Sequence, residues 1–351
     1  MVTLYVTSNE PYAGKTLTCL ALGTRWRRQG RKVGFLKPLG LLPVVVEGQV
    51  TDEDALFIAR QLGVEAPPSH LCPIVLGPDI CHADQEVMRQ TVAAAFRAGA
   101  EGQEVMLVSG LGSLFTRGSA CGLNGPAVAE LLDARVLLVA RSDSFLAVDS
   151  VLAARQVFGD RLAGVILNRV PACQREVIES QVVPCLKEKG IPLLGVLPDD
   201  PLLSSVSVAE IVSATGAELL CGEESRDELV ENLVVGAMGV ESALHYFRQT
   251  PRKCVITGGD RTDIHFAAIE TSTRCLVLTG GLRPSHRVLA RAEEAKVAVV
   301  LVKQDTLSTI TIIEQLIGKQ RVREPKKIEH ALSQYESCLD LARLDAALGL
   351  A

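Results

Sequence analysis

Short apolar runs alternate with longer amphipathic stretches from the first residue to about residue 200. The runs are rich in β-branched residues and show no polar face, whereas the stretches between them repeat apolar residues at helical spacing. Strands that are apolar on both faces and separated by helix-length crossovers are typical of a parallel sheet covered by helices on both sides. The predicted strands are 2–7, 32–36, 104–109, 134–140, 162–168 and 192–196, and the predicted helices are 15–29, 54–61, 84–98, 125–132, 145–158 and 174–189.

A second, smaller alternation of the same kind follows the turn Pro198-Asp199-Asp200-Pro201. Its strands are predicted at 253–257, 274–279 and 297–302, and its helices at 260–270, 284–295 and 306–316. The pattern therefore predicts two α/β domains, over 1–205 and 206–330, with a charged C-terminal helix or tail over 331–351.

Composition narrows the classes of protein without naming one. The chain has 351 residues and a net charge of −5, which argues against a general nucleic-acid binder. Mean hydropathy is +0.25, yet no apolar run approaches the roughly 20 residues that a bilayer span needs. The N-terminus lacks the pattern of a signal peptide, so we expect a cytoplasmic protein. The ten cysteines are spread singly, mostly in apolar segments, and we expect buried thiols rather than a disulfide framework or a zinc site.

The loop after the first predicted strand is a candidate phosphate-binding loop. Gly14, Lys15 and Thr16 match the end of the pattern G-x-x-x-x-G-K-[ST], while Asn9 stands where the first glycine is expected. We expect asparagine to be tolerated there, because it adopts left-handed backbone angles more readily than most residues. In this interpretation backbone N–H groups hold phosphate, Lys15 reaches the terminal phosphoryl oxygens and Thr16 ligates Mg²⁺. The alternative is that Gly-Lys-Thr only starts a helix after a turn.

Four further segments accompany this loop at the expected strand ends. They are Lys37-Pro38 with Thr51-Asp52-Glu53-Asp54 downstream, Val108-Ser109-Gly110-Leu111-Gly112, the segment from Gly164 to Arg169, and the segment from Leu194 to Pro198. Together they resemble dethiobiotin synthetase and its relatives, including the cobyrinic acid amidase branch. The likeness is greatest to the ATP-binding region at the N-terminus of long bacterial phosphotransacetylases, and it covers about residues 1–205. It implies a P-loop NTPase-like parallel sheet with helices on both faces.

The resemblance also implies a role for each matching residue. Lys15 and Thr16 would hold the triphosphate and its metal, and Lys37 would point at the transferred phosphoryl group or the acid substrate as the candidate catalytic residue. Asp52 or Asp54 would be a metal ligand. Both aspartates are also explained as first-turn acids that complement a helix dipole, and that alternative stays open.

Two residues would contact the base. The resemblance implies that Asn168 hydrogen-bonds the adenine ring and that the turn at Pro198 packs against it. Asn168 is equally explained as a turn residue at the end of a strand.

Ser109 departs from the family pattern. The end of the third strand normally carries a glutamate metal ligand in that family, and serine supplies no carboxylate to a hard cation. Together with Asn9, this change argues for at most a weak ATPase or ATP-dependent ligase. The cofactors implied are ATP and Mg²⁺, the latter without the glutamate ligand that Ser109 replaces.

In the second domain, candidate ligand residues follow two neighbouring strands of the predicted sheet. Asp260 and Arg261 follow the first of its strands, and Thr279, Gly280 and Gly281 follow the next. In a parallel sheet these turns share the carboxyl edge, where ligands usually bind. Ordinary strand-to-helix turns, with Asp260 as a helix cap, explain the same residues. The segment resembles the DRTGG domain over about 205–330, which implies a regulatory or assembly role.

These resemblances lead to one expected function and two alternatives. We expect a nucleotide-binding regulatory protein, homo-oligomeric, whose nucleotide state controls a protein partner or assembly. The acetyl-transfer domain of phosphotransacetylases is not expected, because the sequence ends at Ala351. The alternatives are an ATP-dependent ligase or amidase of the dethiobiotin synthetase class, and a scaffold whose degenerate phosphate loop binds partners without nucleotide.

Overall fold

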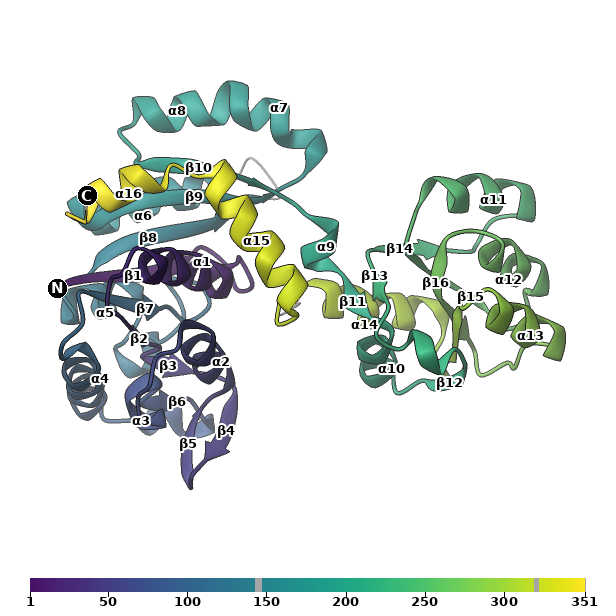
Figure 1. Ribbon diagram of the computed structural model, residues 1–351, viewed down its shortest axis with the longest axis horizontal. Helices are drawn as coiled ribbons and strands as arrows, with labels where there is room; N and C mark the ends of the chain where they lie inside the picture. The colour runs from purple at the N-terminus through teal and green to yellow at the C-terminus, as the bar shows by residue number, and fades with distance from the viewer. Residues whose placement is uncertain (143–146, 319–321, 351) are drawn as a thin grey trace. The chain divides into compact units, whose positions relative to one another are not determined.

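The chain folds into two units, and the first is built from two separate segments. The computed structural model in Figure 1 describes residues 1–142, 147–318 and 322–350. The first unit takes Met1–Asp199 and Arg323–Ala351, and the second takes Asp200–Val322. The domain limits expected from sequence, 205/206 and 330/331, therefore differ by several residues from the points at which the chain passes between units.

A six-stranded parallel sheet forms the centre of the first unit. Its order is β10-β9-β8-β1-β7-β2, and every neighbouring pair is parallel. Because most of their residues are buried, the strands need apolar side chains on both faces. All six strands predicted for this region are present, with bounds β1 (Val2–Ser8), β2 (Val33–Leu36), β7 (Val105–Ser109), β8 (Arg135–Arg141), β9 (Leu162–Val170) and β10 (Leu193–Pro198).

Helices cover both faces of this sheet. On one face Val92, Val128, Val151 and Leu186 join a core with alternate strand residues such as Val108. On the other face α1 packs its fully buried side chains against β1 and β7. The helices are α1 (Lys15–Arg28), α2 (Glu53–Leu62), α3 (Pro68–Leu71), α4 (Gln85–Ala100), α5 (Gly125–Leu131), α6 (Ala147–Phe158), α7 (Arg175–Val177) and α8 (Val183–Glu188).

Two of the predicted helices differ from their expected form. The helix expected over 174–189 is divided by a π-helical turn at Ile178–Val182, between α7 and α8. Of the helix expected over 145–158, residues 145 and 146 lie outside the described ranges, and the remainder is α6.

Four short strands of the first unit were not predicted. They are β3 (Leu39–Gly40), which pairs with β6 (Ile74–Val75), and β4 (Pro43–Val46), which forms a hairpin with β5 (Gln49–Asp52). Strands of two to four residues are too short to show a period of two. The hairpin matters for the site, because its last residue, Asp52, is the N-cap of α2.

The C-terminal segment belongs to the first unit. It forms α15 (Pro325–Cys338) and α16 (Leu341–Ala347), and α15 lies beside α1 (Figure 1). The buried Tyr335 hydroxyl lies 2.8 Å from Thr18 Oγ1, and Trp26 Nε1 donates to Asp345 Oδ1 at 2.8 Å. The sequence analysis expected a helix or tail in a region of its own. Instead the two helices complete the face of the sheet that α1 covers.

The second unit contains a five-stranded sheet in the order β12-β17-β16-β15-β14. Its strands are β12 (Glu218–Cys221), β14 (Asn232–Val235), β15 (Lys253–Gly258), β16 (Thr273–Thr279) and β17 (Ala298–Leu301), with a separate pair β11 (Val206–Ser207) and β13 (Leu229–Val230). The four strands β14 to β17 are parallel, and β12 is antiparallel to β17. Strands β15, β16 and β17 are the three that the sequence predicted.

Six helices accompany this sheet, and apolar clusters form on both of its faces. They are α9 (Pro201–Ser204), α10 (Val208–Thr215), α11 (Val240–Gln249), α12 (Thr262–Ile269), α13 (His286–Glu294) and α14 (Thr306–Gly318). The helices α12, α13 and α14 correspond to the three predicted helices.

Lys253 is a buried cation at the start of β15. It is fully buried, its Nζ lies 5.7 Å from the centre of the Phe247 ring, and Nζ has no hydrogen-bond partner among the described residues. Burial lowers the pKa of Lys253 to about 8. The folded state therefore pays a desolvation cost whenever this amine is charged.

Replacing Lys253 by methionine is expected to stabilise the second unit by up to about 3 kcal/mol at pH 7. The pKa of Lys253 is lower in the folded than in the unfolded state, so the desolvation cost of its charged amine is greatest below about pH 8. It falls as the pH rises towards about 10.5, and stability should rise over that range. Urea unfolding at several pH values, followed by hydrogen exchange in β15 and β16, measures this effect. Lys303→Met, at an exposed lysine of the same unit, is the control and should leave the pH slope unchanged.

Candidate functional site

The phosphate loop connects β1 to α1 and ends on a glycine that no other residue replaces easily. Gly14 has a φ of 104°, in the left-handed region. A Cβ on Gly14 would lie 2.4 Å from Asn168 Nδ2. The helix α1 then begins at Lys15, and no side chain caps its N-terminus. Because the first backbone N–H groups of a helix attract anions, this end of α1 is suited to phosphate.

Lys15 is held at the head of α1 by neutral oxygens. Its Nζ donates to Ser8 Oγ at 2.7 Å and to the Gly112 carbonyl at 3.2 Å. Burial, together with the charge of Lys37, lowers the pKa of Lys15 to about 8. Thr16 follows it, half-buried in the first turn. Ser8 and Gly112 were not singled out from the sequence, because only the pairing of β1 with β7 brings the loops that follow them together.

Asn9 stabilises the loop through its side chain and does not adopt the left-handed angles that the sequence analysis allowed for. Its Oδ1 accepts from Arg141 N at 2.8 Å, and its Nδ2 donates to Arg141 O at 3.3 Å. The left-handed residues of the loop are Tyr12, with a φ of 57°, and Gly14. Asn9 therefore connects the ends of β1 and β8, and that expectation about its backbone was wrong.

Asn168 lies against the phosphate loop. Its Nδ2 donates to the Ala13 carbonyl at 2.8 Å, and its Oδ1 accepts from Arg169 N at 2.9 Å. Pro198 ends the neighbouring strand, where it pairs with Val170. The structure thus brings Asn168 and the end of β10 to the same edge as the phosphate loop.

Lys37 and the two aspartates form a buried ion-pair cluster. Lys37 Nζ donates to Asp52 Oδ1 at 2.7 Å and lies 3.6 Å from Asp54 Oδ2. Asp52 is fully buried, and burial alone would raise its pKa. The Lys37 ammonium and the backbone N–H groups of Leu41 and Leu42 outweigh burial and hold the pKa of Asp52 below its usual value.

Arg323 completes this cluster from the returning segment of the chain. It pairs with Glu53, and its Nη2 lies 3.2 Å from Asp54 Oδ1. Sequence reasoning missed Arg323, because nothing local distinguishes one arginine in a charged stretch from its neighbours.

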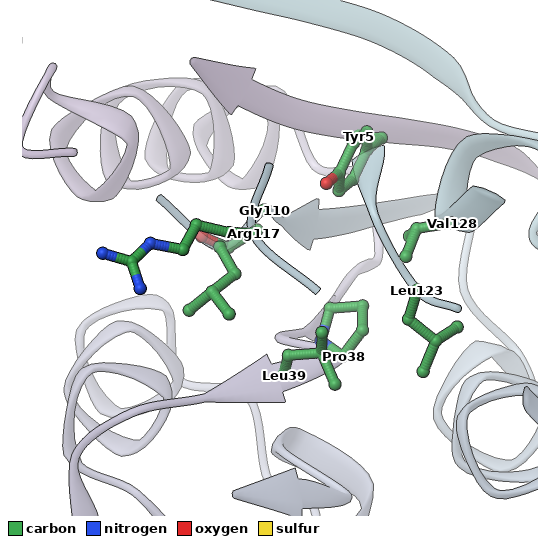
Figure 2. A pocket seen from close by; sticks show the side chains of 9 residues that line it. Tyr5, Pro38, Leu39, Gly110, Arg117, Leu123 and Val128 are labelled. Carbon is green, nitrogen blue, oxygen red and sulfur yellow. The ribbon is translucent and has the colours of Figure 1, made fainter. Parts of the chain in front are cut away.

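Ser109 ends β7 beneath α1 and is buried. Burial raises the pKa of the Cys19 thiol to about 12, while a hydrogen bond with Ser109 acts in the opposite direction. A small pocket opens beside Ser109, where Tyr5, Leu39, Gly110 and Arg117 surround it (Figure 2). Most of the residues that line this pocket are apolar, and Tyr5 adds a hydroxyl group.

In the second unit, the turns after β15 and β16 lie next to each other at the carboxyl edge of the sheet. Several polar groups of these turns have hydrogen-bond or ion-pair partners there. Gly259 N donates to the Thr279 carbonyl at 3.2 Å, which joins the turns after β15 and β16. Arg261 Nη2 donates to Met238 O at 3.1 Å, and Arg261 Nε lies 3.3 Å from Asp263 Oδ1. Thr279 Oγ1 lies 2.9 Å from Thr306 Oγ1, and the Asp260 side chain is exposed.

Glycine is required at the Gly280-Gly281 turn, where φ is 80° and 68°. Their N–H groups donate to Gln304 O and Val302 O, so these donors maintain the fold. Sequence reasoning did not single out His265, which is fully buried in α12, with Nε2 2.9 Å from Gly258 O. Burial lowers the pKa of His265, which favours a neutral imidazole.

The parallel sheet, the strand–loop–helix around Lys15 and the glycine at its end define a P-loop α/β protein. The chain belongs to the AAA domain family, whose model matches residues 2–207, and a DRTGG domain model matches residues 210–316. The resemblance stated from the sequence is confirmed for both parts.

Curated relatives extend this relation over the whole chain. The phosphate acetyltransferase of Deinococcus radiodurans is 26% identical and covers 99% of this chain and 51% of its own length. That of Nitratidesulfovibrio vulgaris is 25% identical and covers 98% and 51%. The chain therefore spans about half the length of the curated relatives that it matches.

Two solved structures are similar to parts of this chain. The septum site-determining protein MinD from Pyrococcus horikoshii, complexed with Mg-ADP, is 17% identical, with a TM-score of 0.35 over 57% of this chain and 83% of that one. The CBS and DRTGG domains of a Clostridium perfringens pyrophosphatase, complexed with the activator diadenosine tetraphosphate, are 21% identical, with a TM-score of 0.31 over 40% and 70%. Across residues 1–142, 147–318 and 322–350, none of the helices combines the length and apolar character needed to cross a bilayer.

Proposed function

We propose that this chain is a nucleotide-binding regulatory protein in which ATP at the phosphate loop controls a protein partner or the chain's own assembly. The observation that carries the proposal is Lys15, whose ammonium donates, among the residues that the structure describes, to neutral oxygens at the uncapped N-terminus of α1. A desolvated cation beside free helix N–H groups favours an anionic ligand. Phosphate oxygens would satisfy both.

The base would lie at the edge formed by β9 and β10. Asn168 already donates to the loop carbonyl of Ala13, and it presents its amide next to the phosphate site. Pro198, at the end of the adjacent strand, offers an apolar surface for a ring. We therefore keep both residues as the proposed contacts of the nucleotide base.

Regulation is supported by the connections between the site and the second unit. The chain leaves the first unit at Asp199, which pairs with Arg169 at 3.3 Å, one residue beyond Asn168. It returns at Arg323, which pairs with Asp54 beside Lys37. Each connection is thus held by an ion pair next to the proposed ligand site. A ligand that shifts these pairs would change the restraint on both connections.

The ligase alternative requires Lys37 to contact substrate. Lys37 is instead 7% exposed and paired with Asp52, so the regulatory proposal accounts better for its environment. For the second unit, the edge at Asp260 and Thr279 remains a proposed ligand site.

The test is a calorimetric titration of the intact chain with ATP, combined with hydrogen exchange. We expect micromolar affinity, about −8 kcal/mol, with changed protection at residues 197–203 and 322–326. Binding without a change at these connections would support a nucleotide site and contradict the regulatory role. Absence of binding at millimolar ATP would favour the scaffold alternative.

A further inference from the structure

The carboxylates beside the phosphate loop are already neutralised by cations of the chain. Asp52 accepts four hydrogen bonds, from Lys37 Nζ at 2.7 Å and from the backbone N–H groups of Ala55, Leu41 and Leu42 at 3.1, 2.9 and 3.0 Å. It is fully buried. A carboxylate in this state has no oxygen facing a loop ligand without loss of several of these bonds.

Asp54 is neutralised in the same way. It lies between Lys37 Nζ at 3.6 Å and Arg323 Nη2 at 3.2 Å, and Arg323 also pairs with Glu53. A divalent cation at Asp54 would have to displace one of these cations or lie beside both. Either arrangement is unfavourable, because like charges repel at this separation.

The remaining position for a metal ligand is occupied by Ser109. It is 4% exposed, and a neutral hydroxyl is a poor substitute for a carboxylate on Mg²⁺. Within the described part of the chain, no group of three or more His, Cys, Asp or Glu side chains is arranged to hold a metal ion. The carboxylates at this loop are therefore not available to Mg²⁺, which leaves the Thr16 hydroxyl as its protein ligand.

Lys15 has the opposite surroundings. Its hydrogen-bond partners among the described residues, Ser8 Oγ and Gly112 O, are neutral, so no carboxylate in that part of the chain is bonded to the Lys15 ammonium. The charge that a ligand must balance at this loop is therefore positive.

We infer that the phosphate loop binds a nucleoside triphosphate as the free anion, through Lys15 and the N-terminus of α1, and does not bind the Mg²⁺ complex preferentially. This inference rests on the proposed function and specifies the form of its ligand. It follows from a cation without a carboxylate partner at Lys15 and from carboxylates that are already paired at Asp52 and Asp54. In such a site the metal gains at most the Thr16 hydroxyl as a protein ligand and removes charge from the phosphates.

The experiment is a titration of the intact chain with ATP in two arms, one with EDTA and one with Mg²⁺ in excess over ATP. We expect the affinity in EDTA to equal or exceed that in Mg²⁺, because Mg²⁺ withdraws the free anion. Binding more than about tenfold tighter in Mg²⁺ would overturn the inference and leave the proposed function intact. Absence of binding in both arms would overturn both.

A gain of metal response provides the second test. Ser109→Glu supplies the missing carboxylate, and in this variant Mg²⁺ should tighten ATP binding by about tenfold or more. The matched control is Ser109→Gln, which has the same size and no charge and should show no such response. If Mg²⁺ acts alike on both variants, Ser109 is not what excludes the metal, and that step of the inference is wrong. Circular dichroism checks folding, and the two-arm titration decides alone if the glutamate variant does not fold.

Discussion

Lys15→Ala is expected to weaken ATP binding by about 100-fold, because a charge-assisted hydrogen bond to phosphate contributes about 1.5–3 kcal/mol. The thermal unfolding temperature should not fall. Lys15 is a partly desolvated cation with neutral partners, and its removal relieves that cost. Calorimetry measures the loss of affinity, and thermal unfolding measures stability on the same samples.

The matched control is Lys187→Ala, at an exposed lysine of α8 in the same unit. It should leave both the affinity and the unfolding temperature unchanged. If Lys15→Ala binds ATP as the unaltered chain does, the nucleotide lies elsewhere. If both variants lose affinity equally, the effect is one of overall charge, and the phosphate loop is not its source.

Asp52→Ala is expected to lower the free energy of unfolding of the first unit by about 3–5 kcal/mol, because it leaves the buried Lys37 ammonium without its counter-ion. The backbone N–H groups of Leu41 and Leu42 also lose their acceptor. The pKa of Asp52 is lowered in the folded state, so its contribution is present above about pH 4 and lost as the pH falls further. Chemical unfolding at pH 3 and pH 7 measures both effects.

A double variant separates the ion pair from the rest of the packing. Lys37→Met combined with Asp52→Asn should recover more than half of the stability that Asp52→Asn loses alone, because no buried charge remains unpaired. Asp160→Asn is the surface control: its carboxylate is 98% exposed and should change stability by less than about 0.5 kcal/mol. Loss of stability at Asp160 as large as at Asp52 would contradict a special role for the buried pair.

The sequence predicted the sheets well, because long apolar strands and helical spacing are local properties. The six strands of the first sheet and strands β15, β16 and β17 of the second are all present. The hairpin of β4 and β5 was missed, since β5 contains polar residues and β4 is not a buried run like the strands that were predicted. The antiparallel edge strand β12 also begins with an exposed polar residue and was missed as well.

The candidate site was predicted only in part, because most of its contacts join distant residues. Gly14, Lys15 and Thr16 stand in one motif and were found from it. Asn9 and Asn168 bond to backbone groups of Arg141 and Ala13, respectively, more than a hundred residues away along the chain. No local sequence pattern predicts a hydrogen bond of this kind. The roles expected for Asp52, Asp54, Asn168 and Pro198 remain predictions.

The division of the first unit between two chain segments has a consequence for its synthesis. Trp26 and Thr18, near the start of the chain, bond to Asp345 and Tyr335, which leave the ribosome only after the whole of the second unit. At about 5–20 residues per second, the side of α1 that contacts α15 stays uncovered while the second unit is made and folds. We therefore expect the nascent first unit to need a chaperone most during the period before its C-terminal helices have been made.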